Sequence, residues 1–364
     1  MSRSGRKHHL SRVLDAHIST VQETLRILER PADSGLEKVE WSEVVKLGDE
    51  VSKQATMAGM LWSGEAPEMK ALEENIGAYC NILHGFILLC HGSTVGAGPT
   101  LHANINVSAK QVVECSLALL REAVSSYESR NREKRLSIPQ LAGAVWESCT
   151  AFKKSPTANC TAIGRAITQV AVSVKDVLRE MGELKEFKST AAPNGSGGED
   201  SNRAPESTST DEEGDDLAET DIGDDLSAEE MAVAQLIISV VSDTLTAIKE
   251  LIRYISGLLK SSSLKVNSKE STDSLEKLLS CCREMGSEVN ELGASVYPPQ
   301  EVYQMKSSVE KMHDLVGKMR IEVTSLEGSS NDVFATFKRL ESSLANLENG
   351  LGNDVARRMG KLVV

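Results

Sequence analysis

Apolar residues recur at alternating steps of three and four along most of this chain, which is the spacing of an amphipathic helix with one buried stripe. In the first half, such stripes begin at Leu10, Val44, Leu72, Val113 and Ile163, with a shorter piece around Val145. Residues typical of turns separate them, as in RPADSG, GEAP, HGSTVGAGP and KKSPT. The pattern predicts five or six helices over residues 1–188.

The second half repeats this pattern with longer stripes. Ser227 and Glu230 are spaced as a capping box, and the longest stripe of the chain follows, from Met231 to Leu259. Three more stripes lie in 275–296, 302–326 and 333–351. We therefore predict a bundle of four helices over residues 227–364.

Two adjacent prolines separate two of these helices, in ELGASVYPPQEVYQMK at 291–306. Proline has no backbone N–H and disfavours α geometry in the residue before it, so Tyr297 should leave the helix. Pro298 and Pro299 suit the first turn of the next helix. The short link predicts that the two helices pack antiparallel.

The acidity of the chain is concentrated between its two halves. Residues 199–230 hold fourteen acids and the base Arg203, a net charge of −13, which equals the formal net charge of all 364 residues. Residues 189–226 are too polar to bury and are predicted to form a disordered linker, with Ser207, Thr208, Ser209 and Thr210 as alternative phosphorylation sites. The expected fold is all-α, with two antiparallel up-and-down helical bundles joined by this linker.

Composition narrows the class of protein. Only 4% of residues are aromatic, which favours helices over sheets, and no apolar run reaches the roughly 18 residues of a membrane span. The N-terminus MSRSGRKHHL has no apolar core after it and is not a secretory signal. Seven cysteines form no CxxC pair, so we interpret them as small core residues in a reducing compartment. We expect no membrane association and a cytoplasmic and nuclear location.

The sequence gives little support for a catalytic or ligand-binding motif. GSTVGAGPT at 92–100 is rich in glycine but lacks the Gly-Lys-Ser/Thr end that binds phosphate, so we interpret it as a flexible link between helices. His84 and His91 lie near Cys80 and Cys90, yet no carboxylate completes a metal set, and structural histidines are the simpler interpretation. We expect no enzyme, no metal and no cofactor.

Basic clusters raise the alternative of nucleic-acid binding. SRNREKR at 129–135 is one cluster, and Arg3, Arg6, Lys7 and Arg12 form another. Such patches bind phosphates or act as nuclear import signals, but the first lies at a helix end, where solvated cations favour the helix dipole. Stacking aromatic residues are missing around it, so we expect no direct binding of nucleic acid.

Four strings carry a resemblance to a known family. They are SVYPP at 295–299, AVWESC at 144–149, VKDVLREM at 174–181 and, after Trp41, VSKQATM at 51–57. Together they resemble the cyclin-D-binding protein family, a eukaryotic group of cell-cycle regulators. The resemblance implies an all-helical, non-catalytic protein that binds D-type cyclins and helix-loop-helix transcription factors and so restrains cyclin-dependent phosphorylation of retinoblastoma-type proteins.

The expected function is regulation by sequestration, with an amphipathic helix and a groove as the mode of binding. Candidate partner-binding residues are Leu245 and Ile252 in the most apolar helix, and Tyr297 and Tyr303 beside the prolines; core packing is an equally open interpretation of each. The alternative function is an adaptor of the cytoskeletal or trafficking type, since fold alone does not separate the two. The oligomeric state is left open.

Overall fold

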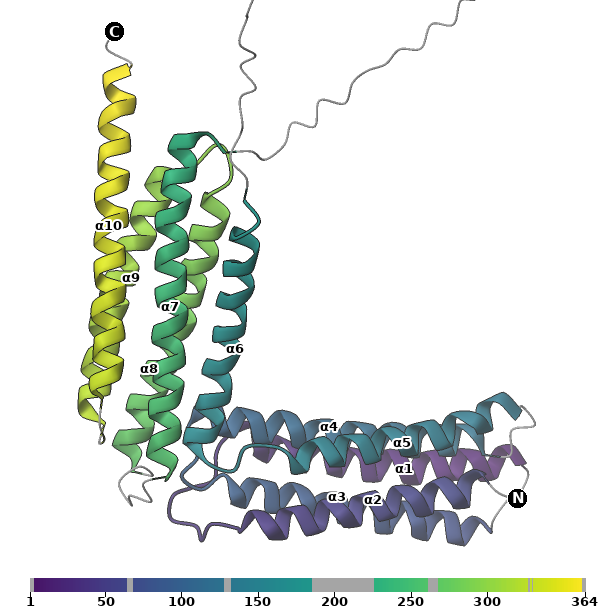
Figure 1. The fold of residues 1–364 in the computed structure, drawn as a ribbon. Coiled ribbons are helices and arrows are strands. Elements are labelled where there is room, and N and C mark those ends of the chain that lie inside the picture. The colour runs from purple at the N-terminus through teal and green to yellow at the C-terminus, as the bar shows by residue number, and fades with distance from the viewer. Residues whose placement is uncertain are drawn as a thin grey trace, which may run out of the picture. The chain divides into compact units, whose positions relative to one another are not determined.

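The structure, a computed structural model, describes residues 3–63, 68–127, 132–184, 226–260, 268–326, 328 and 330–361. Within these ranges the chain forms ten α-helices, one short 3-10 helix and no strand (Figure 1). The helices are α1 (Arg3–Leu25), η1 (Arg26–Glu29), α2 (Trp41–Ser63), α3 (Met69–Ser93), α4 (Pro99–Ser126), α5 (Arg132–Lys153), α6 (Asn159–Met181), α7 (Ala228–Lys260), α8 (Lys269–Ser295), α9 (Val302–Ser325) and α10 (Asn331–Lys361).

The predicted all-α fold of two helical bundles is confirmed. The acidic linker expected at 189–226 lies outside the described residues, apart from Leu226, which is buried. The capping box at the start of α7 is also confirmed. The Glu230 N–H donates to Ser227 Oγ at 3.2 Å, and the Ser227 N–H donates to Glu230 Oε2 at 3.0 Å.

Contacts divide the chain into two compact units, which we call the first and the second unit. The first comprises Met1–Gln169, Glu250–Cys282 and Met319–Asn331, and the second comprises Val170–Lys249, Arg283–Lys318 and Asp332–Val364. Both units therefore take part of α6, α7, α8 and α9. The domain bounds expected from the sequence, 1–188 and 227–364, stay a prediction.

The first unit is built on α1 to α5 and has an aromatic core. Helix α5 packs against α2 and α4, and α3 packs against α1 and α2 (Figure 1). Phe152 stacks on Trp41 and meets Phe86 edge-on, with ring centroids 5.0 Å apart in each pair. Such pairs add about 0.5–1.5 kcal/mol beyond the area that they bury.

The second unit has a mostly aliphatic core, to which α10 adds the buried ring of Phe337. Its buried side chains include Ile237, Val240 and Val241 of α7, Val289 and Leu292 of α8, Val309 and Val316 of α9, and Leu340 and Leu344 of α10. Two glycines of α8, seven residues apart, let α6 approach closely. A Cβ at Gly286 would lie 2.9 Å from Val170 Cγ1, and one at Gly293 would lie 2.9 Å from Val177 Cγ1.

Helix α7 is both long and strongly apolar. By length and composition alone, Ala228–Leu258 could cross a membrane. However, 56% of the most apolar part of this helix is buried within the protein, and the core helix of a soluble protein meets the same criteria. The helix is thus weak evidence for a membrane span.

Candidate functional site

The most exposed aromatic side chain of the described residues follows directly after the link between α8 and α9, residues 296–301. Helix α8 ends at Ser295 and α9 begins at Val302, so Pro298 and Pro299 lie in the link, both exposed, and not in the first turn of α9 as the sequence predicted. Tyr303, one residue into α9, is 86% exposed. Because tyrosine is enriched among the residues that dominate binding energy at interfaces, Tyr303 is a candidate contact for a protein partner.

One buried amide holds this link in place. Gln300 Nε2 donates to the carbonyl oxygens of Val296 and Glu230, at 3.0 Å each, and so connects the end of α8 to the first turn of α7. The side-chain oxygen of Gln300 is buried without a hydrogen-bond partner. The link is therefore fixed at one residue, while its prolines face outward.

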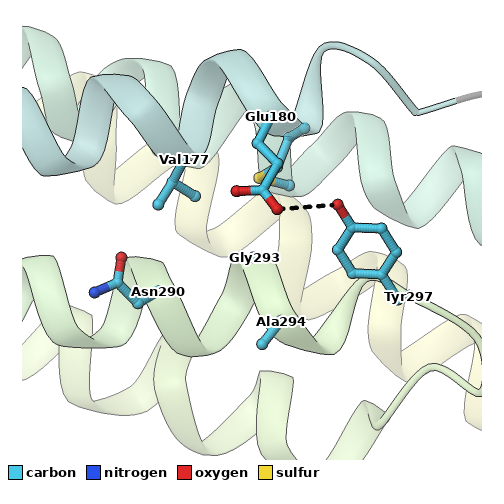
Figure 2. A pocket seen from close by; sticks show the side chains of 7 residues that line it. Val177, Glu180, Asn290, Gly293, Ala294 and Tyr297 are labelled. Atoms are coloured by element: carbon cyan, nitrogen blue, oxygen red, sulfur yellow. Dashed lines mark hydrogen bonds between the residues drawn. The ribbon is translucent and has the colours of Figure 1, made fainter.

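Tyr297 lies over a small hollow between α6 and α8. The hollow has a volume of about 230 Å³ and is lined by Val177, Glu180 and Met181 of α6 and by Asn290, Gly293, Ala294 and Tyr297 at the end of α8. Figure 2 shows Tyr297 closing one end, where its hydroxyl donates to Glu180 Oε1 at 3.5 Å, and Val177 extending from α6 toward α8. Because Gly293 has no side chain, Val177 packs directly against α8 and forms one wall of the hollow.

The four candidate residues from the sequence fall in different environments. Tyr297 is half-buried and Tyr303 is exposed, both in the second unit, whereas Leu245 is only 5% exposed in the core of that unit. A partner can contact Leu245 only if α7 moves away from the helices that cover this side chain. Ile252 is half-buried and belongs to the first unit, so the structure does not gather the four residues into one site.

A second exposed apolar surface lies on α2 and α5 of the first unit, and the sequence reasoning did not single it out as a site. Trp146 is 44% exposed, and its Nε1–H donates to Thr56 Oγ1 at 3.1 Å and to the Ser52 carbonyl at 3.3 Å. Met60, 72% exposed, follows Thr56 by one turn of α2. The sequence did contain a signal for this surface. AVWESC and VSKQATM, two of the strings that carry the resemblance, contact each other here through Trp146 and Thr56.

The other two strings also meet in space. VKDVLREM supplies Val177, Glu180 and Met181 to the α6–α8 hollow, and SVYPP supplies Tyr297. Residues more than a hundred positions apart in the sequence thus form one surface feature. The four strings that carry the resemblance thus come together in two surface features, and we treat both features as candidate binding sites.

The glycine-rich segment at 92–100 forms the α3–α4 link, and side chains occupy its backbone donors. Asn159 Oδ1 accepts from the Gly98 N–H at 2.8 Å, and Glu276 Oε1 accepts from the Thr100 N–H at 2.8 Å. A phosphate at the start of α4 would meet the Glu276 carboxylate in its place. The segment was expected to be flexible, but the structure ties it at several points.

The cysteines and histidines of the described residues are placed as structural groups. Burial raises the pKa of Cys80 to about 11 and that of Cys90 well above its usual value, so these thiols stay protonated and are poor nucleophiles at neutral pH. His84 Nδ1 lies 2.9 Å from Thr24 Oγ1. Within the described ranges, no group of three or more His, Cys, Asp or Glu residues is placed to hold a metal ion. The side chains of the basic cluster at 129–135 lie outside the described residues.

Comparison with protein families decides the assignment. A family model described as Grap2 and cyclin-D-interacting, N-terminal, matches residues 43–187, and its C-terminal counterpart matches residues 209–321. The chain belongs to the Grap2 and cyclin-D-interacting family. The resemblance inferred from the four strings is thereby confirmed, and no curated protein matches the chain.

The family assignment covers both surfaces described above. The α2–α5 surface and the α6 wall of the hollow lie within the N-terminal match, and the α8–α9 link with Tyr297 and Tyr303 lies within the C-terminal match. The name of the family indicates an interacting protein, with cyclin D among the partners, and gives no indication of catalysis.

Proposed function

We propose that this protein is a non-catalytic regulator that binds D-type cyclins, helix-loop-helix transcription factors or both, and restrains cell-cycle progression by sequestering them. The observation that carries the proposal is the exposed aromatic ring of Tyr303 beside the exposed prolines of the α8–α9 link. Tyrosine is enriched among the residues that dominate binding energy at interfaces. We call the surface formed by Tyr297, Pro298, Pro299 and Tyr303 the proline corner.

Sequestration follows from mass action and requires no chemistry at the surface. A partner held on the proline corner is removed from its productive complexes in proportion to the concentration of this protein above the dissociation constant. The mechanism requires the two proteins to share a compartment, and we place this encounter in the cytoplasm and the nucleus.

The rigid placement of the corner favours binding without refolding. Gln300 fixes the link from inside, and Val296 and Met305 on either side of the exposed residues are fully buried. Ordering costs on binding should be low, because the backbone that presents the tyrosines is already held. A truncation of Tyr303 therefore removes contact area and leaves the fold intact.

Affinity for a purified D-type cyclin tests the proposal, by calorimetry on the full chain. We expect Tyr303→Ala to weaken binding about tenfold, the loss of about 1.4 kcal/mol that is typical of a contributing interface residue. Its unfolding free energy should change by less than about 0.5 kcal/mol, because the side chain is exposed. Ile321→Ala is the matched control, since Ile321 is 68% exposed on the same helix but lies in the first unit.

A kinase assay tests the sequestration step. The wild-type chain, added above its dissociation constant, should lower phosphorylation of a retinoblastoma-type substrate by a cyclin-D-dependent kinase, and Tyr303→Ala should do so only at about tenfold higher concentration. Tight binding with undiminished kinase activity would contradict sequestration. Binding to actin-linked or vesicle proteins in place of cyclins would favour the adaptor alternative.

A further inference from the structure

The α6–α8 hollow combines three kinds of surface within a volume of about 230 Å³. Val177, Gly293 and Ala294 give it an apolar wall, Glu180 contributes a carboxylate, and Tyr297 contributes an aromatic ring. Pockets for drug-sized ligands have volumes of about 300–1,000 Å³, so the hollow suits a single long side chain better than a free small molecule.

We propose that this hollow receives an arginine side chain of the protein partner, which deepens the proposed function and rests on it. The methylene stem would lie along Val177 and Ala294, as long basic side chains do on apolar surface. The guanidinium group would pair with the Glu180 carboxylate beside the face of the Tyr297 ring.

The existing contact between the two polar side chains is easily rearranged. The Tyr297 hydroxyl and Glu180 Oε1 are 3.5 Å apart, beyond the usual range of about 2.5–3.0 Å for an O–H···O bond. A guanidinium group at a normal distance gives the carboxylate a stronger, charge-assisted partner than the hydroxyl does. The hollow therefore gains hydrogen bonding when a cation enters it.

The charges around the hollow favour a cation over an anion. Among the residues that line the hollow, Glu180 carries the one charge, and it is negative. On α6, the nearby base Arg179 is paired with Asp176 at 3.5 Å. A phosphorylated or acidic partner would meet the Glu180 charge unfavourably, whereas a basic segment is complementary to it.

The test uses Nα-acetyl-arginine methylamide as the probe and methyl NMR of the full chain. The probe should shift the methyl signals of Val177 and Ala294 saturably at millimolar concentration. The citrulline analogue has nearly the same shape without the charge, and it should bind at least threefold more weakly. Leu315 reports on general attraction, because it lines a separate hollow with Glu288, Lys311 and Asp314, and its signal should stay unchanged.

Two variants separate the roles of charge and space. Glu180→Gln should weaken the probe at least threefold, and Ala294→Leu should abolish its binding by filling the hollow. Both side chains are exposed, so circular dichroism should show unchanged helicity. Equal shifts with citrulline, or equal binding by Glu180→Gln, would overturn the proposal.

Cyclin binding by the same variants distinguishes this inference from the proposed function. If the wild type binds a D-type cyclin and Glu180→Gln binds it at least threefold more weakly, both stand. If the wild type and Glu180→Gln bind cyclin equally well, the role of the hollow in receiving an arginine is refuted, while the proposed function stands. If the wild type does not bind cyclin but does bind the arginine probe, cyclin is refuted as the partner. The preference of the hollow for an arginine side chain then still stands.

Discussion

The α3–α4 link of the first unit and the α8–α9 link of the second are built in opposite ways. The α3–α4 link, residues 94–98, is rich in glycine, with Gly96 at φ 73°, and side chains from other helices bind its backbone. The α8–α9 link is rich in proline, and the buried amide of Gln300 ties it from within. Tyr303, two residues after the α8–α9 link, is 86% exposed.

The difference shows how to tell a structural link from a binding surface. In the α3–α4 link the side-chain amide of Asn159 reaches three partners, because Oδ1 accepts from Gly98 and Nδ2 donates to the Gly96 carbonyl and to Thr272 Oγ1. These polar groups of the link are thus hydrogen-bonded within the fold. In the α8–α9 link Pro298 and Pro299 are exposed, and Tyr303 just after it is exposed as well, so a partner could cover these side chains.

The largest effect on stability should follow from Asn159→Ala. The change leaves the buried Gly98 N–H without its partner, and such an orphaned group costs about 1–3 kcal/mol, whereas the carbonyl of the exposed Gly96 can bond to water. We expect a loss of about 1–3 kcal/mol in the free energy of unfolding, measured by urea denaturation. Gln304→Ala is a control from the start of α9, just after the other link, because the contact of Gln304 with Glu291, at 3.4 Å, lies at the surface. Equal stabilities of the two variants would contradict the contrast between the links.

Glu276→Ala should have the next largest effect. Its carboxylate accepts from the Thr100 N–H at 2.8 Å and from Thr100 Oγ1 at 2.7 Å, so it acts as the cap that the start of α4 otherwise lacks. Removing a cap of this kind costs about 0.5–2 kcal/mol. Glu276→Gln keeps an oxygen for the N–H but removes the charge favoured at a helix start, and should cost less than the alanine variant. The reverse order would show that packing, and not capping, is what Glu276 supplies.

Periodicity in the sequence predicted the helices well, since burial of an amphipathic stripe is a local property. The stripe of α9, for example, is buried at Met305, Val309 and Met312 as expected. In α7, burial extends beyond the predicted stripe to Ile237, Val240 and other positions, because this helix has neighbours on a wider face than one stripe.

Contacts between distant segments could not be predicted in the same way. Glu276 caps α4 through Thr100, 176 positions earlier, and the Tyr297 hydroxyl reaches a carboxylate 117 positions away. No local pattern encodes such pairings. The aromatic residues of the proline corner were found because prolines break a helix visibly, whereas Glu180 was one glutamate among many. Leu245 and Tyr303 were equally plausible contacts until their exposure separated them.

Gln300→Ala should destabilise the chain less than Asn159→Ala does. The variant loses two hydrogen bonds to carbonyl oxygens, but it also removes a side-chain oxygen that is already buried without a partner. The relief of that penalty offsets part of the loss, and we expect a net cost of about 1 kcal/mol by urea denaturation. A cost as large as that of Asn159→Ala would mean that the two links are fixed to the same degree.

The smallest effect is a dependence on pH at the last turn of α3, directly before the α3–α4 link. The pKa of His91, whose carbonyl accepts from the Thr94 N–H and hydroxyl, is lowered by burial and, to a lesser extent, by the nearby His102. The native state therefore disfavours the charged imidazole, while the unfolded chain takes up a proton near pH 6.5. Stability should be constant above about pH 7 and fall as the pH drops below about 6.5, toward the lower folded pKa.

The variant His91→Gln tests which histidine carries this dependence. The urea midpoint of the wild type should fall between pH 7.5 and pH 5.5, and the fall should be smaller in His91→Gln. It should not vanish, since burial and His17 also lower the pKa of His84. The α8–α9 link has no counterpart, because residues 291–306 contain no histidine. An identical fall in wild type and variant would place the acid sensitivity elsewhere and remove this difference between the two links.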